Sequence, residues 1–246
     1  MSLRPEAEPF AATGGPVGAV LCHGLTGMPG SLRQWGEQLA DAGLTVRVPR
    51  LPGHGTTWKD ANRTSWQDWY AELERTFDDV RSRCTKTFVM GLSMGGTLIL
   101  RLAEQRGADV AGVVAVNPSL FTLRKEAKLL PLLRLVVPSM PPVGNDIKKP
   151  GVTEPAYDRL PVKAAYQLAQ LWKLTNADLA KISQPLLVLT SRDDHVVEPA
   201  NSDRLMEGAG TTDKRQVVLE DSYHVATMDN DLPRIVEESL AFVQAH

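Results

Sequence analysis

Gly91-Leu92-Ser93-Met94-Gly95 is the segment that decides the fold of this chain, because two different local patterns meet there. The preceding apolar run, Lys86 to Leu92, is typical of a buried strand, and the following residues, Thr97 to Glu104, have a helical pattern. A serine between them is lifted out of a tight strand-to-helix turn, and glycines two positions away on either side let neighbouring backbone pass close to it. Because so short a motif can occur by chance, its surroundings must decide whether Ser93 is a nucleophile.

Short apolar runs alternate with helical patterns along the chain. The runs are rich in Val and Leu and bounded by Gly, Pro or Asp, which is typical of parallel strands covered on both faces. They span residues 17–22, 44–48, 86–90, 110–116, 185–190 and 216–219, and the helical patterns span residues 31–42, 66–80, 97–105, 199–207 and 232–243. The alternation predicts an α/β chain, with a mostly parallel sheet and helices on both faces.

One stretch, from Ser119 to about Leu160, interrupts this alternation. It is rich in proline, contains a basic and then apolar piece, Lys125–Val137, and has no clear strand pattern. We therefore expect residues 1–118 and 161–246 to form one discontinuous core, and residues 119–160 to form a small cap inserted over the sheet.

Composition and charge limit the classes of function. The 246 residues are 43% hydrophobic and 23% charged, which is usual for a globular protein with a sizeable core. The net charge of −2, with scattered Lys and Arg, makes nucleic acid an unexpected partner. Residues 1–10 lack the apolar run of a secretory signal and no segment reaches bilayer length, so we expect a cytoplasmic protein.

Cys22 and Cys84 are expected to be reduced packing residues.

A serine hydroxyl becomes a nucleophile when a base takes its proton and a third group orients that base. Among the five histidines, His224 is the best candidate base, because it follows the run at 216–219 by a few loop residues. Loops that follow parallel strands share one edge of the sheet, and Ser93 lies on such a loop. His23 and His54 are expected to be structural hydrogen-bonding residues.

The carboxylate that orients His224 is expected in the segment Ser191–Val197, directly after the run at 185–190. Asp194 or Asp193 could serve, and the chain order Ser93, Asp194, His224 is that of the α/β-hydrolases. Three adjacent residues, Asp193-Asp194-His195, cannot easily converge on one ion, so we expect no metal here and a solvated turn for Asp193 and His195.

An acyl-transfer site must also hold the oxyanion of the tetrahedral intermediate, usually with backbone N–H donors. One expected donor is Met94, directly after Ser93. The other is Leu25, in the glycine-containing loop that follows the first predicted core strand. Because only their backbones act, the side chains of Leu25 and Met94 stay free to line an acyl pocket.

From residue 17 to the C-terminus, these motifs resemble the α/β-hydrolase superfamily. The resemblance rests on His23-Gly24, Leu51-Pro52-Gly53-His54-Gly55, Gly91–Gly96, the Asp194 turn and the His224 loop. Longer segments resemble the bacterial monoacylglycerol lipases and small carboxylesterases. They are Gly144-Asn145-Asp146-Ile147-Lys148, Gly151-Val152, Glu154-Pro155-Ala156-Tyr157, Ser191–Val197 and Ser222–Asp229.

The resemblance implies a hydrolase of short- to medium-chain esters or monoacylglycerols, with a cap over an acyl tunnel and no cofactor. It implies that Ser93 is the nucleophile, His224 the base and Asp194 the acid that orients it. It also implies that Leu25 and Met94 are the oxyanion donors, although Leu25 stands where phenylalanine is common and so changes the expected pocket width.

Two cap residues also match the family pattern. Val143 stands where the family has an apolar residue over the alcohol pocket, and Glu154 where it has a glutamate that can bind glycerol hydroxyls. An exposed surface charge is an equally weighted interpretation of Glu154.

Other functions use the same groups, and the alternatives are a thioesterase, an amidase or a C–C bond hydrolase. The Leu-rich piece at 129–137 favours a small-molecule ester with an apolar acyl chain as substrate. The same piece could rest on lipid aggregates. Alternatively, its leucines could only pack the cap onto the core. From a different class, a hydrolase fold could serve as a ligand-binding module, which has no need of nucleophile, base and acid together.

Overall fold

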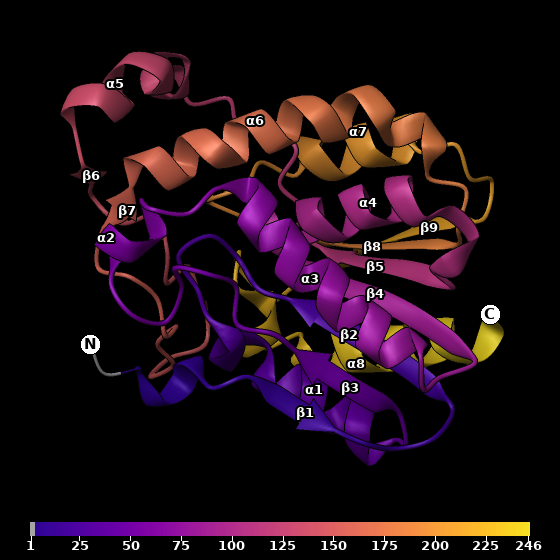
Figure 1. Ribbon diagram of the computed structural model, residues 1–246. Coiled ribbons are helices and arrows are strands. Elements are labelled where there is room, and N and C mark those ends of the chain that lie inside the picture. Colours follow the sequence, from indigo (N-terminus) through magenta and orange to yellow (C-terminus); the bar gives the residue numbers. More distant parts are fainter. Residues whose placement is uncertain (1–2) are drawn as a thin grey trace.

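The computed structural model describes residues 3–246, in which one seven-stranded sheet lies between two layers of helices (Figure 1). The strand order is β1-β3-β2-β4-β5-β8-β9, and all neighbours are parallel except β1 and β3. The strands are β1 Phe10–Ala12, β2 Val17–Cys22, β3 Thr45–Val48, β4 Lys86–Leu92, β5 Gly112–Val116, β8 Leu186–Ser191 and β9 Lys214–Leu219, and a small second sheet pairs β6 Ser139–Met140 with β7 Leu160–Pro161. The predicted mostly parallel sheet with helices on both faces is confirmed.

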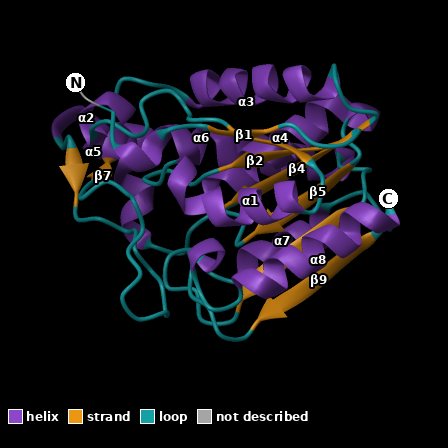
Figure 2. Cartoon of the chain, turned by 90° about the horizontal axis from the view of Figure 1, so that it is seen from below, coloured by secondary structure: helices purple, strands orange, loops and turns teal. Residues whose placement is uncertain are grey.

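Eight α-helices lie within residues 3–246, and each covers a sheet face, another helix or a loop. They are α1 Arg33–Asp41, α2 Trp58–Ala61, α3 Trp66–Arg81, α4 Met94–Arg106, α5 Leu130–Val136, α6 Val162–Asp178, α7 Ala200–Gly208 and α8 Leu232–Ala245. Figure 1 shows α3, α4, α6 and α7 above the sheet and α1 and α8 below it. Seen from below in Figure 2, α1 and α8 lie side by side.

Each face of the sheet has its own apolar core, because successive residues of a strand point to opposite faces. Val20 and Val89 are buried in the core beneath α3 and α4. Leu21 and Met90, their neighbours in sequence, are buried in the core that α1 and α8 cover. A strand that is buried on both faces therefore has consecutive apolar residues in its sequence, and for this reason the sequence predicts such strands well.

Strand β1 and helix α6 are among the elements that were not predicted. The edge strand β1 is only three residues long and none of its residues is fully buried, so it leaves no apolar run. Helix α6 is seventeen residues long, and Ala164, Leu168, Leu171 and Thr175 line its buried side at helical spacing. Small and polar residues on that side hide the pattern, and a search for large apolar residues misses it.

Between β5 and α6 the chain leaves the sheet. It forms the 3₁₀ helix η4 (Lys125–Leu129), then α5, then a long loop between the two strands of the small sheet. A small separate core joins Leu130 of α5 to Val162 and Ala165 of α6. The division of the chain into a core and a cap at residues 119–160 stays a prediction.

The turn from β4 to α4 is where backbone segments approach most tightly. Ser93 has φ of 57° and ψ of −120°, outside the regions that L-residues favour. A Cβ on Gly95 would lie 1.9 Å from the carbonyl oxygen of Cys22 on β2, and a Cβ on Gly91 would lie 2.6 Å from Gly95. Only glycine fits at these two positions.

Gly95→Ala should lower the free energy of unfolding by about 3 kcal/mol, because the new methyl group would displace the backbone of β2. Gly151→Ala is the control, since Gly151 also has a positive φ but a methyl there meets nothing within 4 Å; it should cost only about 1 kcal/mol. Urea denaturation measures both losses, and equal losses would contradict the packing explanation.

Candidate active site

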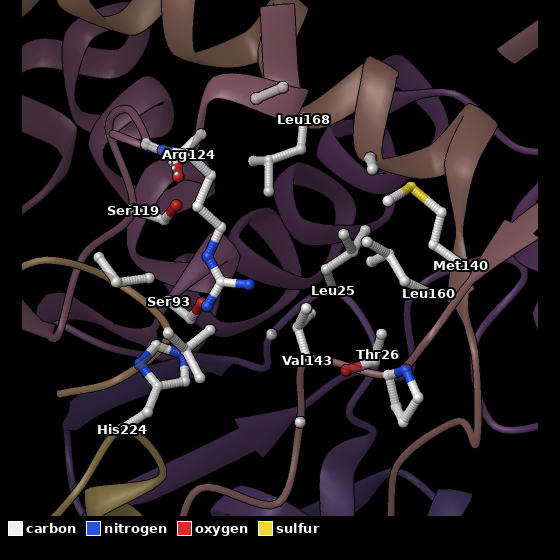
Figure 3. Close-up of a pocket in the computed structure, with 18 of the residues that line it drawn as sticks. Leu25, Thr26, Ser93, Ser119, Arg124, Met140, Val143, Leu160, Leu168 and His224 are labelled. Atoms are coloured by element: carbon white, nitrogen blue, oxygen red, sulfur yellow. Dashed lines mark hydrogen bonds between the residues drawn. The ribbon is translucent and has the colours of Figure 1, made fainter. Parts of the chain in front are cut away.

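Ser93 lies at the carboxyl end of β4, directly before α4. Its backbone N–H donates to the carbonyl of Val116 at 3.1 Å, and its carbonyl accepts from the N–H of Ser119 at 3.2 Å. These bonds hold the strained turn against the end of β5. Ser93 and His224 line the same cavity, and Figure 3 shows the two side chains next to each other on one side of it.

His224 and Asp194 form a buried pair. Nδ1 of His224 lies 2.7 Å from Oδ2 of Asp194, and the two side chains are 7% and 1% exposed. The other oxygen of Asp194 accepts from the N–H groups of Val196 and Val197, both at 2.8 Å. Because Nδ1–H is given to a carboxylate that is itself fixed, Nε2 is the nitrogen left to take a proton at Ser93.

The surroundings of His224 make it a stronger base than free imidazole. Burial disfavours the charged ring, but the charge and hydrogen bond of Asp194 favour it, and Glu154 and Asp146 add to this effect. The result is a pKa raised above its ordinary value of 6.5. A general base acts in its neutral form, so His224 can serve as one above the raised pKa and loses this capacity as the pH falls through it.

Two backbone N–H groups are available beside Ser93. Met94 is the first residue of α4, and the N–H groups of a first turn have no partner within the helix. The N–H of Leu25 donates to no backbone carbonyl within residues 3–246. The loop that carries Leu25 is close to Ser93, since a Cβ on Gly24 would lie 3.5 Å from the Cβ of Ser93.

His23 and His54 are structural, as predicted, and they hold the Leu25 loop. Both are fully buried and pack edge to face, with ring centres 5.1 Å apart. Burial lowers the pKa of His23 to about 3 and also lowers the pKa of His54. Nε2 of His54 lies 2.7 Å from the carbonyl oxygen of Leu25, a contact that orients the Leu25 peptide next to Ser93.

The three side chains of the Asp193-Asp194-His195 turn have different surroundings. Asp194 points inward to His224, whereas Asp193 is exposed to solvent. His195 is 59% exposed, and its Nδ1 lies 2.9 Å from Oδ1 of Asp146. The solvated turn predicted for Asp193 and His195 agrees with their exposure, but the contact of His195 with Asp146 was not predicted.

A cavity of about 430 Å³ opens from Ser93 toward the residues between β5 and α6. Its wall is mostly apolar, and Figure 3 shows Leu25, Met140, Leu160 and Leu168 across from Ser93 and His224. The volume lies within the usual range for small-molecule sites. Leu25 lines this wall, as expected. The side chain of Met94, which was also expected to line the pocket, does not: it is fully buried in the core beneath α3 and α4.

Val143 and Glu154 also line the cavity. Oε2 of Glu154 accepts from the N–H of Asn145 at 3.0 Å, and Oδ1 of Asn145 accepts from the N–H of Glu154 at 2.8 Å. Burial raises the pKa of Glu154. Glu154 is therefore held in place beside the cavity and is not a freely exposed surface charge.

Three residues that hold the site together were not singled out from the sequence. Asn117, after β5, donates from Nδ2 to the carbonyl of His224 at 2.8 Å and to Oγ of Ser191 at 2.9 Å. Oγ of Ser191 in turn donates to the carbonyl of Tyr223 at 2.8 Å. Asp146 accepts from the N–H of His224 at 3.1 Å. The position of Asn117 directly after an apolar strand is a usable signal. Asp146 lies in a segment that shows a family resemblance but no strand or helix pattern.

The chain is similar to known proteins over nearly its whole length. The protein family described as serine aminopeptidase S33 matches residues 18–231. A thermostable monoacylglycerol lipase from Bacillus sp. (strain H-257) is 44% identical over 245 residues, which cover 98% of this chain and 95% of that protein. A human monoglyceride lipase is 25% identical over 245 residues, and the match covers 91% of this chain and 80% of that protein.

Solved structures give the same result. A structure reported for the metagenome-derived lipolytic enzymes LipS and LipT has a TM-score of 0.97 and 38% identity, and the match covers both chains completely. A monoacylglycerol lipase from Paleococcus ferrophilus has a TM-score of 0.81 and 22% identity over the whole of both chains, which shows a common fold. The predicted α/β-hydrolase fold is confirmed.

Asp194→Asn should slow the reaction of Ser93 with a fluorophosphonate probe by on the order of 10⁴-fold, because the amide no longer holds the reactive tautomer of His224. Asp193→Asn removes a neighbouring exposed carboxylate and should change the labelling rate little. Gel-based labelling kinetics compare the two variants, and the reverse order of effects would move the acid to Asp193.

Proposed function

The chain belongs to the serine aminopeptidase S33 family of α/β hydrolases, and we propose that it is a serine hydrolase that cleaves carboxylic esters, with monoacylglycerols as the preferred class. The observation that carries this proposal is the buried His224–Asp194 pair beside Ser93 in an apolar cavity. The lipases and the carboxylesterase among its relatives support ester hydrolysis.

In the proposed mechanism, Nε2 of His224 takes the proton of Ser93, and Oγ of Ser93 attacks the ester carbonyl. The oxyanion of the tetrahedral intermediate receives hydrogen bonds from the N–H groups of Leu25 and Met94. The C–O bond to the alcohol breaks, and His224 returns its proton to the leaving oxygen. Water, activated by the same histidine, then releases the acid and regenerates Ser93.

Ser93→Ala should lower kcat for ester hydrolysis by on the order of a million-fold, because the covalent intermediate can no longer form. Ser119→Ala removes another hydroxyl from the same cavity and should change kcat by less than about tenfold. p-Nitrophenyl esters of graded chain length provide the assay. Near-normal hydrolysis by Ser93→Ala would refute the mechanism.

The substrate class rests on the two ends of the cavity. The apolar wall, with Leu130, Leu168 and Trp172, suits an acyl chain of short to medium length. Val143, Gly144 and Glu154 line the cavity together with His224, where the alcohol would leave. A carboxylate held in place there can accept hydrogen bonds from the two free hydroxyls of a monoacylglycerol, which triacylglycerols lack.

Glu154→Gln should reduce kcat/KM for a monoacylglycerol about tenfold relative to the methyl ester of the same acid, because a charged acceptor for the glycerol hydroxyls is lost. Glu126→Gln is the matched control, since Glu126 lines the same cavity but is exposed on η4. A panel of mono-, di- and triacylglycerols, thioesters and amides measures the preference. An unchanged ratio in Glu154→Gln would remove this residue from alcohol recognition.

We further propose that the outer side of the cap rests on anionic lipid aggregates. Five of the eight exposed large apolar residues in the described chain lie within 123–136: Leu123, Leu129, Leu132, Leu135 and Val136. The same stretch has four basic residues and one acidic residue. No helix within residues 3–246 is long and apolar enough to cross a membrane. The cytoplasmic location stays a prediction.

Replacing Leu132 and Leu135 together by Ser should reduce co-sedimentation with phosphatidylglycerol vesicles about tenfold or more, since each leucine loses its burial in the lipid interface. Hydrolysis of p-nitrophenyl acetate in solution should be unchanged. Val218→Ser on β9 is the control for an exposed apolar residue outside the cap. Failure of the unmodified protein to bind vesicles would leave an esterase acting on dispersed substrate.

A further inference from the structure

The carboxylate of Asp146 lies between the two loops that carry the base and its orienting acid. Oδ2 of Asp146 accepts from the backbone N–H of His224 and from that of His195, both at 3.1 Å. Oδ1 lies 2.9 Å from Nδ1 of His195, and the Asp146 side chain is only 16% exposed. The carbonyl of Asp146 also accepts from the N–H of Val225 at 3.0 Å. One residue thus joins the Asp194 turn to the His224 loop.

A second set of hydrogen bonds, made by Asp229, holds the segment that carries Asp146 against the His224 loop. The N–H groups of Lys148 and Lys149 donate to the carboxylate of Asp229 at 2.7 Å and 2.9 Å. The same carboxylate accepts from the N–H of Tyr223 at 2.9 Å. Asp146 is therefore presented to the His224 loop from a rigid support, and it does not line the cavity.

We propose that Asp146 is a positioning residue for His224, which fixes the backbone of the base and places a negative charge behind its imidazole. This inference rests on the proposed Ser93–His224–Asp194 chemistry and adds a fourth side chain to it. The fixed backbone keeps Nε2 of His224 aimed at Ser93. The charge stabilises the imidazolium that forms when Ser93 attacks.

The charged groups around this contact determine the sign of the expected effect. His224 faces three carboxylates, those of Asp194, Glu154 and Asp146, and their charges favour its protonated form. Asp146 itself faces His195, while the amine of the nearby Lys148 is engaged with Asp221 at 2.8 Å. Removing the charge of Asp146 therefore lowers the pKa of His224 and moves the acidic limb of kcat/KM to lower pH.

Two substitutions separate geometry from charge. Asp146→Ala removes the acceptor for both backbone N–H groups, so kcat should fall about a hundredfold through misplacement of the base. Asp146→Asn keeps one acceptor oxygen and should restore most of that loss, while its acidic limb moves to lower pH by about 0.5 to 1 pH unit. KM should change less than about threefold in both variants, because Asp146 lies outside the cavity.

Asp221→Asn is the matched control. It removes a 60% exposed carboxylate from the same loop without touching the backbone of His224, and both kcat and the acidic limb should stay as in the unmodified protein. Circular dichroism and the fluorophosphonate labelling rate are measured on every variant, so that a folding defect is recognised and Asp146→Asn, the milder change, still decides the question.

Three results would overturn the proposal: unchanged kcat and pH profile in both Asp146 variants, a loss confined to KM, or an equal shift in Asp221→Asn. Loss of activity in Ser93→Ala together with unaffected Asp146 variants refutes only the role of Asp146. Full activity in Ser93→Ala refutes the proposed chemistry itself.

Discussion

The contact on which the site depends is the close approach of α4 to β2 at Gly95. Because no side chain fits between Gly95 and the carbonyl of Cys22, the first turn of α4 lies directly against the end of β2, next to the middle strand β4. Ser93, directly before this turn, has a positive φ and lies close to the loop after β2. The proposed nucleophile and the proposed oxyanion donors therefore share one packing constraint, and the surrounding sheet holds the local strain in place.

The parallel sheet explains why the remaining groups meet. Every loop that follows a parallel strand emerges at the same edge, so residues after β2, β4, β5, β8 and β9 converge there although the sequence separates them widely. The convergence of these loops does not by itself fix the orientation of the His224 side chain. Hydrogen bonds from Asn117, Ser191 and Asp146 to the backbone of the His224 loop and its neighbours fix that orientation. The proposed chemistry of Ser93, Asp194 and His224 thus relies on polar contacts made by neighbouring residues.

The sequence predicts what local patterns determine, and it misses what distant contacts determine. Central strands are predicted well because both their faces are buried. The sequence also places Ser93, Asp194 and His224 after such strands in a known order, and the structure brings the proposed base and acid, His224 and Asp194, into contact. Helix α6 was not predicted because the small residue Ala164 and the polar residue Thr175 form part of its buried side. The contacts of Asp146 could not be predicted because they form only when its segment packs against two loops that are 49 and 78 residues away in sequence.

In the proposed mechanism, Ser93 forms a covalent acyl intermediate. Mass spectrometry of the enzyme, quenched with acid during turnover of a p-nitrophenyl ester, detects this intermediate. We expect an added acyl mass on the peptide that contains Ser93, and none on the same peptide of Ser93→Ala. An acyl group on another residue would refute this mechanism. Steady hydrolysis without any acyl-enzyme would refute it too, provided that none is found in the Asp194→Asn enzyme either, whose slower turnover should let the intermediate accumulate.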